Sequence, residues 1–338
     1  MVILMNKTKV MINPSQHLNL DIFTDRLPLA PSRDGFGKGL LEAGKQDERI
    51  VALCADLAES TRMHWFQEVF PERYVELGVA EQNLAVVGSG MAAAGKIPFI
   101  SSYATFNPGR NWEQIRTTIC LNDVPVIVVG SHAGVSVGPD GATHQALEDI
   151  AITRVLPGMT VVIPADSEEA RKATLALAQY NAPAYLRLAR DKAPVFTTEE
   201  TPFEIGKASV VMESENPVVT IIACGDMVYQ SMLAAKELEG DIAVTVINLS
   251  TIKPLDSKTI LEHVQKSGAV VTAEEHQIAG GMGSVVAELL AQELPTPIEF
   301  IGVHDRFGQS GNKKELYKEY GLAVEDIIEK AKKVVSRK

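Results

Sequence analysis

From residue 33 onward, short apolar runs alternate with segments whose apolar residues recur every three or four positions. The runs are typical of buried strands, and the wider spacing is typical of amphipathic helices. In the first half, the pattern predicts strands at 50–55, 97–101, 124–129, 160–163 and 184–188, and helices at 34–45, 84–95 and 167–180. Strands that alternate with helices predict a mostly parallel sheet with helices on both faces.

A second pattern of the same kind follows residue 203. It predicts strands at 218–223, 243–248, 269–273 and 298–302, and a last helix at 324–335. We therefore expect an α/β protein with two domains of mainly parallel sheet, residues 33–192 and 204–338.

Two stretches lie outside this pattern. Residues 193–203 are charged and contain proline, which indicates a linker. Residues 1–32 contain Pro14, Pro28 and Pro31 and show little periodicity. We expect an irregular N-terminal extension that lies on a partner subunit.

Composition excludes several classes of function. The 338 residues carry a net charge of −11, whereas non-specific nucleic-acid binding needs a basic surface. No apolar run approaches the roughly 20 residues of a membrane-spanning helix, and no cleavage-site pattern follows the first residues. The three cysteines, Cys54, Cys120 and Cys224, have neither a disulfide nor a zinc spacing, so we expect buried reduced thiols in a cytoplasmic protein.

Four segments carry the candidate chemistry, namely residues 74–83, 102–107, 130–134 and 140–145. The first leads Glu81 out of an apolar strand and into a helix rich in alanine and glycine. The order and spacing of these segments resemble those of transketolases, and the resemblance runs from about residue 33 to the C-terminus. It implies a thiamine pyrimidine-binding domain followed by a transketolase C-terminal domain.

The resemblance assigns residues to the cofactor, thiamine diphosphate. A carboxyl group that hydrogen-bonds the aminopyrimidine ring activates this cofactor, and Glu81 matches that position. A glutamate stabilised by a helix dipole is the simpler explanation of this residue alone. Phe106 matches the phenylalanine that stacks on the pyrimidine, with Tyr103 close by. Asp56 matches an aspartate near the thiazolium side, although a turn residue at a strand end fits it equally well.

Residues 140–145, Asp-Gly-Ala-Thr-His-Gln, are the most specific substrate signal. The resemblance implies that Asp140 binds a hydroxyl of the donor sugar and that His144 binds oxygens at its reacting end. An imidazole there suits proton transfer, because it titrates near neutral pH. Either residue alone would more often be a turn residue or a satisfied polar group.

A sugar phosphate needs a cationic end to its pocket. The family's positions for this role correspond to Arg33, Ser60, His132 and Arg190. Each alone could be a surface charge or a capping group, but together they favour a phosphorylated sugar over a simple keto acid. In the second domain, the glycines of 280–283 are a weak signal for a phosphate cradle, and we assign no catalytic residue there.

One part of the family's machinery is missing. The diphosphate and Mg²⁺ are held there by a Gly-Asp-Gly segment and an asparagine about 25 to 30 residues later. This sequence contains no such pair, so we expect no metal ligand on this chain and an N-terminal partner subunit that carries the diphosphate-binding domain. Because the family's active site forms between protomers, we expect homodimerisation of this chain within a heterotetramer.

The resulting prediction is the C-terminal subunit of a split transketolase, active only with its partner. It would transfer a two-carbon ketol group from a ketose phosphate to an aldose, as in the pentose phosphate pathway. The enzymatic alternatives are a subunit of a 1-deoxyxylulose-5-phosphate synthase-like or a 2-oxo-acid dehydrogenase-like enzyme. A non-catalytic binding module of this family would instead show eroded active positions, whereas all those named above keep their residue types.

Overall fold

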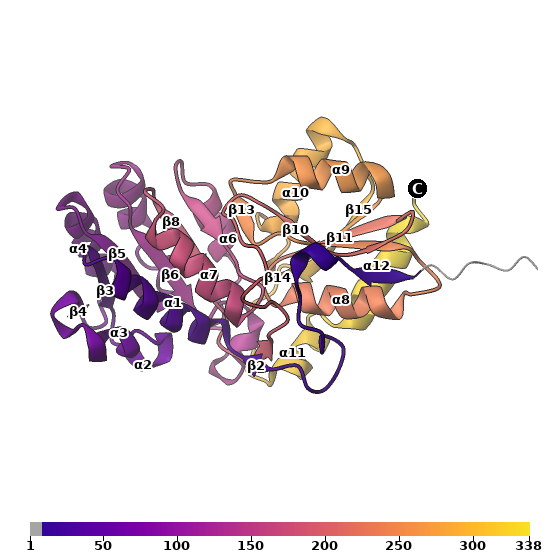
Figure 1. Cartoon of the computed structure of the whole chain (residues 1–338). Helices are drawn as coiled ribbons and strands as arrows, with labels where there is room; N and C mark the ends of the chain where they lie inside the picture. The colour runs from indigo at the N-terminus through magenta and orange to yellow at the C-terminus, as the bar shows by residue number, and fades with distance from the viewer. Residues whose placement is uncertain (1–8) are drawn as a thin grey trace, which may run out of the picture.

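The computed structural model describes residues 9–338, which form two α/β units lying side by side (Figure 1). The first unit contains a seven-stranded sheet in the order β13-β7-β8-β6-β5-β3-β4, in which β13 is Thr251–Lys253. Its parallel strands are β3 (Ile50–Cys54), β4 (Tyr74–Glu76), β5 (Ile97–Tyr103), β6 (Ile127–Ser131), β7 (Thr160–Val162) and β8 (Ala184–Arg187). The predicted α/β class with mainly parallel sheets is confirmed.

Helices cover both faces of this sheet. Apolar side chains of α1 (Ser32–Gln46), α3 (His64–Val69) and α7 (Ser167–Ala178) share one core cluster with it. The opposite face packs against α4 (Glu81–Ala93), α6 (Asp149–Arg154) and a π-helical turn at Ile115–Cys120. Short helices at Ala58–Thr61 (α2) and Trp112–Gln114 (α5) lie in the connections.

The second unit contains a six-stranded sheet in the order β1-β10-β12-β11-β14-β15. Four strands are parallel, namely β11 (Val219–Ala223), β12 (Val244–Asn248), β14 (Val270–Gln277) and β15 (Ile298–Val303). Two strands, β10 (Ser209–Ser214) and β1 (Val10–Ile12), extend one edge in antiparallel pairing.

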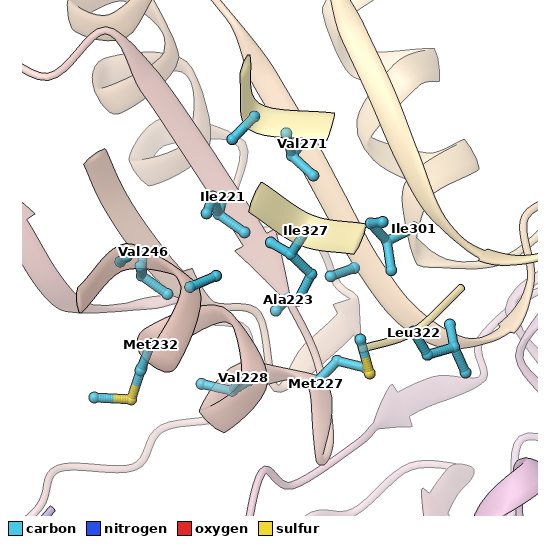
Figure 2. Close-up of a cluster of buried hydrophobic side chains, with 14 of the residues drawn as sticks. Ile221, Ala223, Met227, Val228, Met232, Val246, Val271, Ile301, Leu322 and Ile327 are labelled. Carbon is cyan, nitrogen blue, oxygen red and sulfur yellow. The ribbon is translucent and has the colours of Figure 1, made fainter. Parts of the chain in front are cut away.

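The helices of this unit also lie on two faces. Figure 2 shows the cluster on one face, where Ile221, Val246, Val271 and Ile301 of the sheet face Met227, Val228, Met232 and Ile327. These last residues belong to α8 (Met227–Glu237) and α12 (Val324–Val335). The other face packs on α9 (Ser257–Ser267) and α10 (Met282–Glu293), and α11 (Lys313–Glu319) lies near the first unit.

The N-terminal segment packs on the chain itself. Residues 9–31 lie along the chain's own second unit, where Val10 pairs with Ser214 and the side chain of Ile22 is buried. A short strand, β2 (Leu29–Ala30), then pairs with β9 (Ala193–Pro194). The prediction missed this packing because the buried side chains follow no regular period. Residues 1–8 of the predicted extension lie outside the described residues.

The predicted linker is also packed. Phe196 is fully buried, and the carboxylate of Asp166 accepts hydrogen bonds from the backbone N–H groups of Phe196 and Thr197. In addition, β13 (Thr251–Lys253) leaves the second unit and pairs antiparallel with β7 of the first. The two units therefore share backbone pairing as well as apolar contacts. Within the described residues, no helix combines the length and apolar character needed to cross a membrane.

Candidate active site

Glu81 is the first residue of α4 and its side chain is 1% exposed. Ser102 at the end of β5 donates its hydroxyl to Glu81 Oε1 at 3.1 Å. On the other side, Nη1 of Arg110 lies 3.4 Å from Glu81 Oε2. The carboxylate is therefore buried in the protein, whereas its cationic partner Arg110 is half-exposed.

Two asparagines fix the backbone around Glu81. The amide of Asn107 donates to the carbonyl oxygens of Ile100 and Val129, which ties the segment after β5 to two strands. One helical turn later, Asn111 Nδ2 donates to the Glu81 carbonyl oxygen at 2.9 Å. Both asparagines are fully buried, so α4 and the 104–111 segment are held in one arrangement.

Aromatic rings form a cluster next to Arg110. Tyr103 stacks on His132 with ring centroids 3.9 Å apart and lies 6.3 Å from Phe106 at an angle of 18°. The imidazole of His144 meets the Phe106 ring edge-on at 5.6 Å. The guanidinium carbon of Arg110 lies 5.2 Å from the Phe106 ring centroid.

A cationic region adjoins these rings. Arg33 Nη1 lies 3.3 Å from Nε2 of His132 and donates to the Ser60 carbonyl oxygen at 2.7 Å. Burial lowers the pKa of His132 to about 2, and the nearby charges of Arg33, Arg190 and Arg62 act in the same direction. Burial also lowers the pKa of Arg33. This region presents guanidinium charge beside a neutral imidazole.

The predicted substrate residues lie on the loop after β6. A 3₁₀ segment at Val135–Asp140 is followed by Gly141 with φ 75°, a conformation that favours glycine. Asp140 is exposed, and the half-buried His144 turns toward the rings. Arg190 Nη1 donates to the Val137 carbonyl oxygen at 3.0 Å, so it holds this loop as well as contributing charge.

Two predicted site residues, Asp56 and Ser60, have no side-chain hydrogen bond with the site residues described above. Asp56 has φ 58° and an exposed side chain, and its backbone N–H donates to Glu76 Oε1 at 2.8 Å. The same Glu76 oxygen accepts from the Gly78 N–H, which holds the loop that leads to Glu81. Ser60 contributes its backbone carbonyl to Arg33, as described above.

Sequence reasoning missed Arg110 and the positions of Asn107 and Asn111. A spacing of four residues links Phe106 to Arg110 and Asn107 to Asn111, which places each pair on one side of a helical turn. A cation four residues after an aromatic residue was the available signal, because a guanidinium and a ring attract each other.

The glycines of 280–283 have a structural role. The carboxylate of Glu274 accepts hydrogen bonds from the Met282 and Gly283 N–H groups, at the position a phosphate would take at this helix N-terminus. A Cβ atom on Gly281 would lie 2.2 Å from that carboxylate. The described residues contain no group of three or more His, Cys, Asp or Glu that could hold a metal ion.

Two family models match the chain. The model described as "Transketolase, pyrimidine binding domain" matches residues 30–195, and "Transketolase, C-terminal domain" matches residues 206–327. Together they cover both units of the fold.

Relatives of similar length match almost end to end. A 6-deoxy-6-sulfo-D-fructose transketolase subunit from Clostridium sp. (strain MSTE9) is 40% identical, over 90% of this chain and 95% of its own. A putative transketolase C-terminal section from Methanocaldococcus jannaschii is 41% identical, over 88% and 94%. An apulose-4-phosphate transketolase subunit from Phocaeicola vulgatus is 36% identical, over 90% and 97%.

Solved structures agree. A split-gene transketolase, described as an inactive β4 tetramer, superposes with a TM-score of 0.84 at 41% identity, over 90% of this chain and 98% of its own. The transketolase of Leishmania mexicana, at 24% identity and a TM-score of 0.77, shares the fold over 47% of its length. The chain therefore belongs to the transketolase family and corresponds to the C-terminal subunit of its split members.

Proposed function

We propose that this chain is the cytoplasmic C-terminal subunit of a transketolase that moves a two-carbon ketol group from a ketose phosphate to an aldose. The observation that carries the proposal is the Glu81 carboxylate, which is buried at a helix start and linked through the Arg110 guanidinium to the Phe106 ring. Residues 33–192 would act as the pyrimidine-binding domain, 193–203 as the connection, and 204–338 as the C-terminal domain.

The residues present fit thiamine diphosphate. The planar Arg110 guanidinium already bonds to Glu81 and lies near the Phe106 ring, which are the two relationships an aminopyrimidine requires. When bound, the cofactor would supply the nucleophilic carbon that ketol transfer requires. Glu81 would hold the ring and its proton, Phe106 and Tyr103 would stack, and Asp56 would lie toward the thiazolium side.

The substrate residues divide into a reacting end and an anionic end. His144, beside the Phe106 ring, would move a proton at the substrate oxygens, and the exposed Asp140 would bind a donor hydroxyl. Arg33, Ser60, His132 and Arg190 would receive the substrate's anionic group. The two relatives named for a sulfonated and a phosphorylated sugar fit a site built for a tetrahedral anion.

The partner in this proposal is an N-terminal transketolase subunit. It would supply the diphosphate-binding domain and the Mg²⁺ ligands, and two copies of each chain would form a heterotetramer. Support comes from relatives of similar length that are named as subunits.

A second candidate is a subunit of a 1-deoxyxylulose-5-phosphate synthase-like enzyme. The synthase of Caldanaerobacter subterraneus is 36% identical over 88% of this chain, which spans 47% of that relative. This identity equals that of the apulose-4-phosphate transketolase subunit.

A native pull-down of this chain, followed by mass spectrometry, would identify the partner. The purified complex would then be given xylulose 5-phosphate or pyruvate as donor, with an aldose phosphate as acceptor. We expect ketol transfer from xylulose 5-phosphate and none from pyruvate. Turnover of pyruvate with release of CO₂ would favour the synthase-like candidate, and failure of the complex to bind thiamine diphosphate would favour a non-catalytic module.

A further inference from the structure

The loop that carries Asp140 packs against the second unit. We call residues 134–141 the substrate loop. Its Gly138 lies so close to the 308–311 segment that a Cβ atom there would be 3.1 Å from the Gly311 carbonyl oxygen. Just after the loop, Gln145 Nε2 donates to the carbonyl oxygens of Val135 at 3.0 Å and Gln309 at 2.9 Å. The loop therefore takes its shape partly from the C-terminal domain.

Glu275, near the C-terminal end of β14, makes the most direct of these contacts. Its side chain is buried, and its Oε1 accepts a hydrogen bond from the Ser136 N–H at 2.5 Å. Its Oε2 accepts from the Ser136 hydroxyl at 3.2 Å and the Tyr317 hydroxyl at 3.0 Å. A Cβ atom on Gly134 would lie 2.4 Å from the carboxyl carbon, and Gly134 has φ 85°, so only glycine permits this approach.

The surroundings of Glu275 act on its pKa in both directions. Burial raises the pKa of this carboxyl group, and the hydrogen bond from the Ser136 N–H lowers it. Among the nearby charges, Asp226 raises this pKa, while Lys313 and Arg187 lower it, and Asp226 is itself paired with Lys313 at 2.7 Å.

We propose that Glu275 is a positioning residue of the sugar site, which fixes the substrate loop from the C-terminal domain and thereby sets the place of Asp140. The inference rests on the proposed function for its consequence on substrate binding. It assigns the C-terminal domain a part in substrate recognition that acts through this loop, beyond subunit packing. Arg190 of the first unit donates a hydrogen bond to the Val137 carbonyl oxygen of the same loop. The substrate loop therefore has side-chain contacts from both units.

The neighbouring residue provides a matched control. Glu274 is equally buried on the same strand, but its carboxylate binds the start of α10 and does not contact the substrate loop. Replacing Glu274 or Glu275 by alanine removes a buried carboxylate from β14 in both cases. Only the second change releases Ser136.

Hydrogen exchange on the purified chain tests the contact without the partner or cofactor. In Glu275→Ala we expect the Ser136 amide to exchange at least about 10-fold faster, because its acceptor is gone. Glu275→Gln keeps an acceptor oxygen and should raise exchange by less than about threefold. In Glu274→Ala the amides of Met282 and Gly283 should exchange faster, with the substrate loop unchanged. Wild-type exchange of Ser136 in Glu275→Ala, or equal acceleration in Glu274→Ala, would overturn the proposal.

If Glu275→Ala does not fold, Tyr317→Phe weakens the same contact with a smaller change. It removes one donor, so exchange of the loop amides should rise about two- to fivefold. No change in this variant would count against the proposal.

Kinetics with the assembled complex test the consequence. For Glu275→Ala we expect KM for the donor sugar to rise about 10-fold, with kcat and the thiamine diphosphate Kd within about twofold, whereas Glu275→Gln should raise KM by less than about threefold. A fall in kcat with unchanged KM would contradict a positioning role in substrate binding. If the wild-type complex transfers no ketol group, the proposed function fails, while the exchange result on the chain alone still decides whether Glu275 holds the loop.

Discussion

The guanidinium of Arg33 lies 3.3 Å from Nε2 of His132. A guanidinium can only donate, so this imidazole nitrogen must accept and the ring must be neutral. The other ring nitrogen then carries the proton, and it lies 2.8 Å from the Ser131 hydroxyl oxygen. His132 therefore acts as an oriented, uncharged hydrogen-bonding group beside the cations, whatever the pH in the physiological range.

The pKa of His132 makes stability depend on pH. Its pKa falls from an ordinary 6.5 to about 2 on folding, because the ring is buried beside arginines. Below pH 6.5 the unfolded chain binds a proton that the folded chain does not, so stability is full above this pH and is lost as pH falls. Between pH 6.5 and 5 this loss is about 2 kcal/mol.

Urea unfolding of wild type and His132→Asn at both pH values measures the effect. The variant should lose about 2 kcal/mol less than wild type over this interval. Equal losses in wild type and His132→Asn would show that the ring is protonated in the folded protein.

Replacement of Glu81 by glutamine should reduce ketol transfer by at least about 100-fold in the assembled complex, since the amide cannot supply the acid–base function. The fold should persist, because Asn111 bonds to the backbone of this residue. Donor turnover by the complex is the measurement. Glu113→Gln, an exposed carboxylate of α5, should retain full activity. Retention of more than a few percent of activity in Glu81→Gln would refute the assigned role.

Two glycines should respond to alanine in opposite directions. A Cβ atom on Gly35 of α1 would lie 1.7 Å from the Ser167 carbonyl oxygen, so Gly35→Ala must force α1 and α7 apart and should cost about 1–3 kcal/mol. Nothing lies within 4 Å of a Cβ atom on Gly90 in α4, so Gly90→Ala should add about 0.5–1 kcal/mol of stability. Denaturant midpoints of the chain alone test both, and a destabilised Gly90→Ala would contradict the open space at that position.

The N-terminal segment should contribute to stability without a partner. Ile22 is 1% exposed in the core of the second unit, so Ile22→Ala should cost about 2–4 kcal/mol. Leu20, two residues earlier, is 98% exposed, and Leu20→Ala should change stability by less than about 0.5 kcal/mol. Thermal unfolding of the isolated chain measures both. Similar small effects would mean that residues 9–31 do not pack on this unit in solution.

The sequence predicted the elements whose pattern is local. The apolar runs of β3 and β5 and the small-residue helix α4 were recognised, since each is several residues long and regular. The placement of Glu81 at a helix start followed from the same pattern. The boundaries of the domains and the roles of the site residues stay predictions.

What escaped prediction depends on contacts between distant segments. Ser136 and Glu275 are separated by 139 positions, and no spacing rule joins them. The strands β1 and β13 have three residues each, too few for a period to show. Arg110 has an ordinary residue type at an ordinary position, and only the fold brings it to Glu81.

The pairing of β13 with β7 also bears on how the protein is made. The first unit cannot complete its sheet until Lys253 has emerged from the ribosome, after most of the second unit's first strands have been synthesised. Until then β7 remains an open edge, which is the kind of surface that chaperones shield and that pairs wrongly with other chains. A gene fragment ending before residue 251 should therefore yield insoluble protein even though it encodes every residue proposed to contact the cofactor or the substrate.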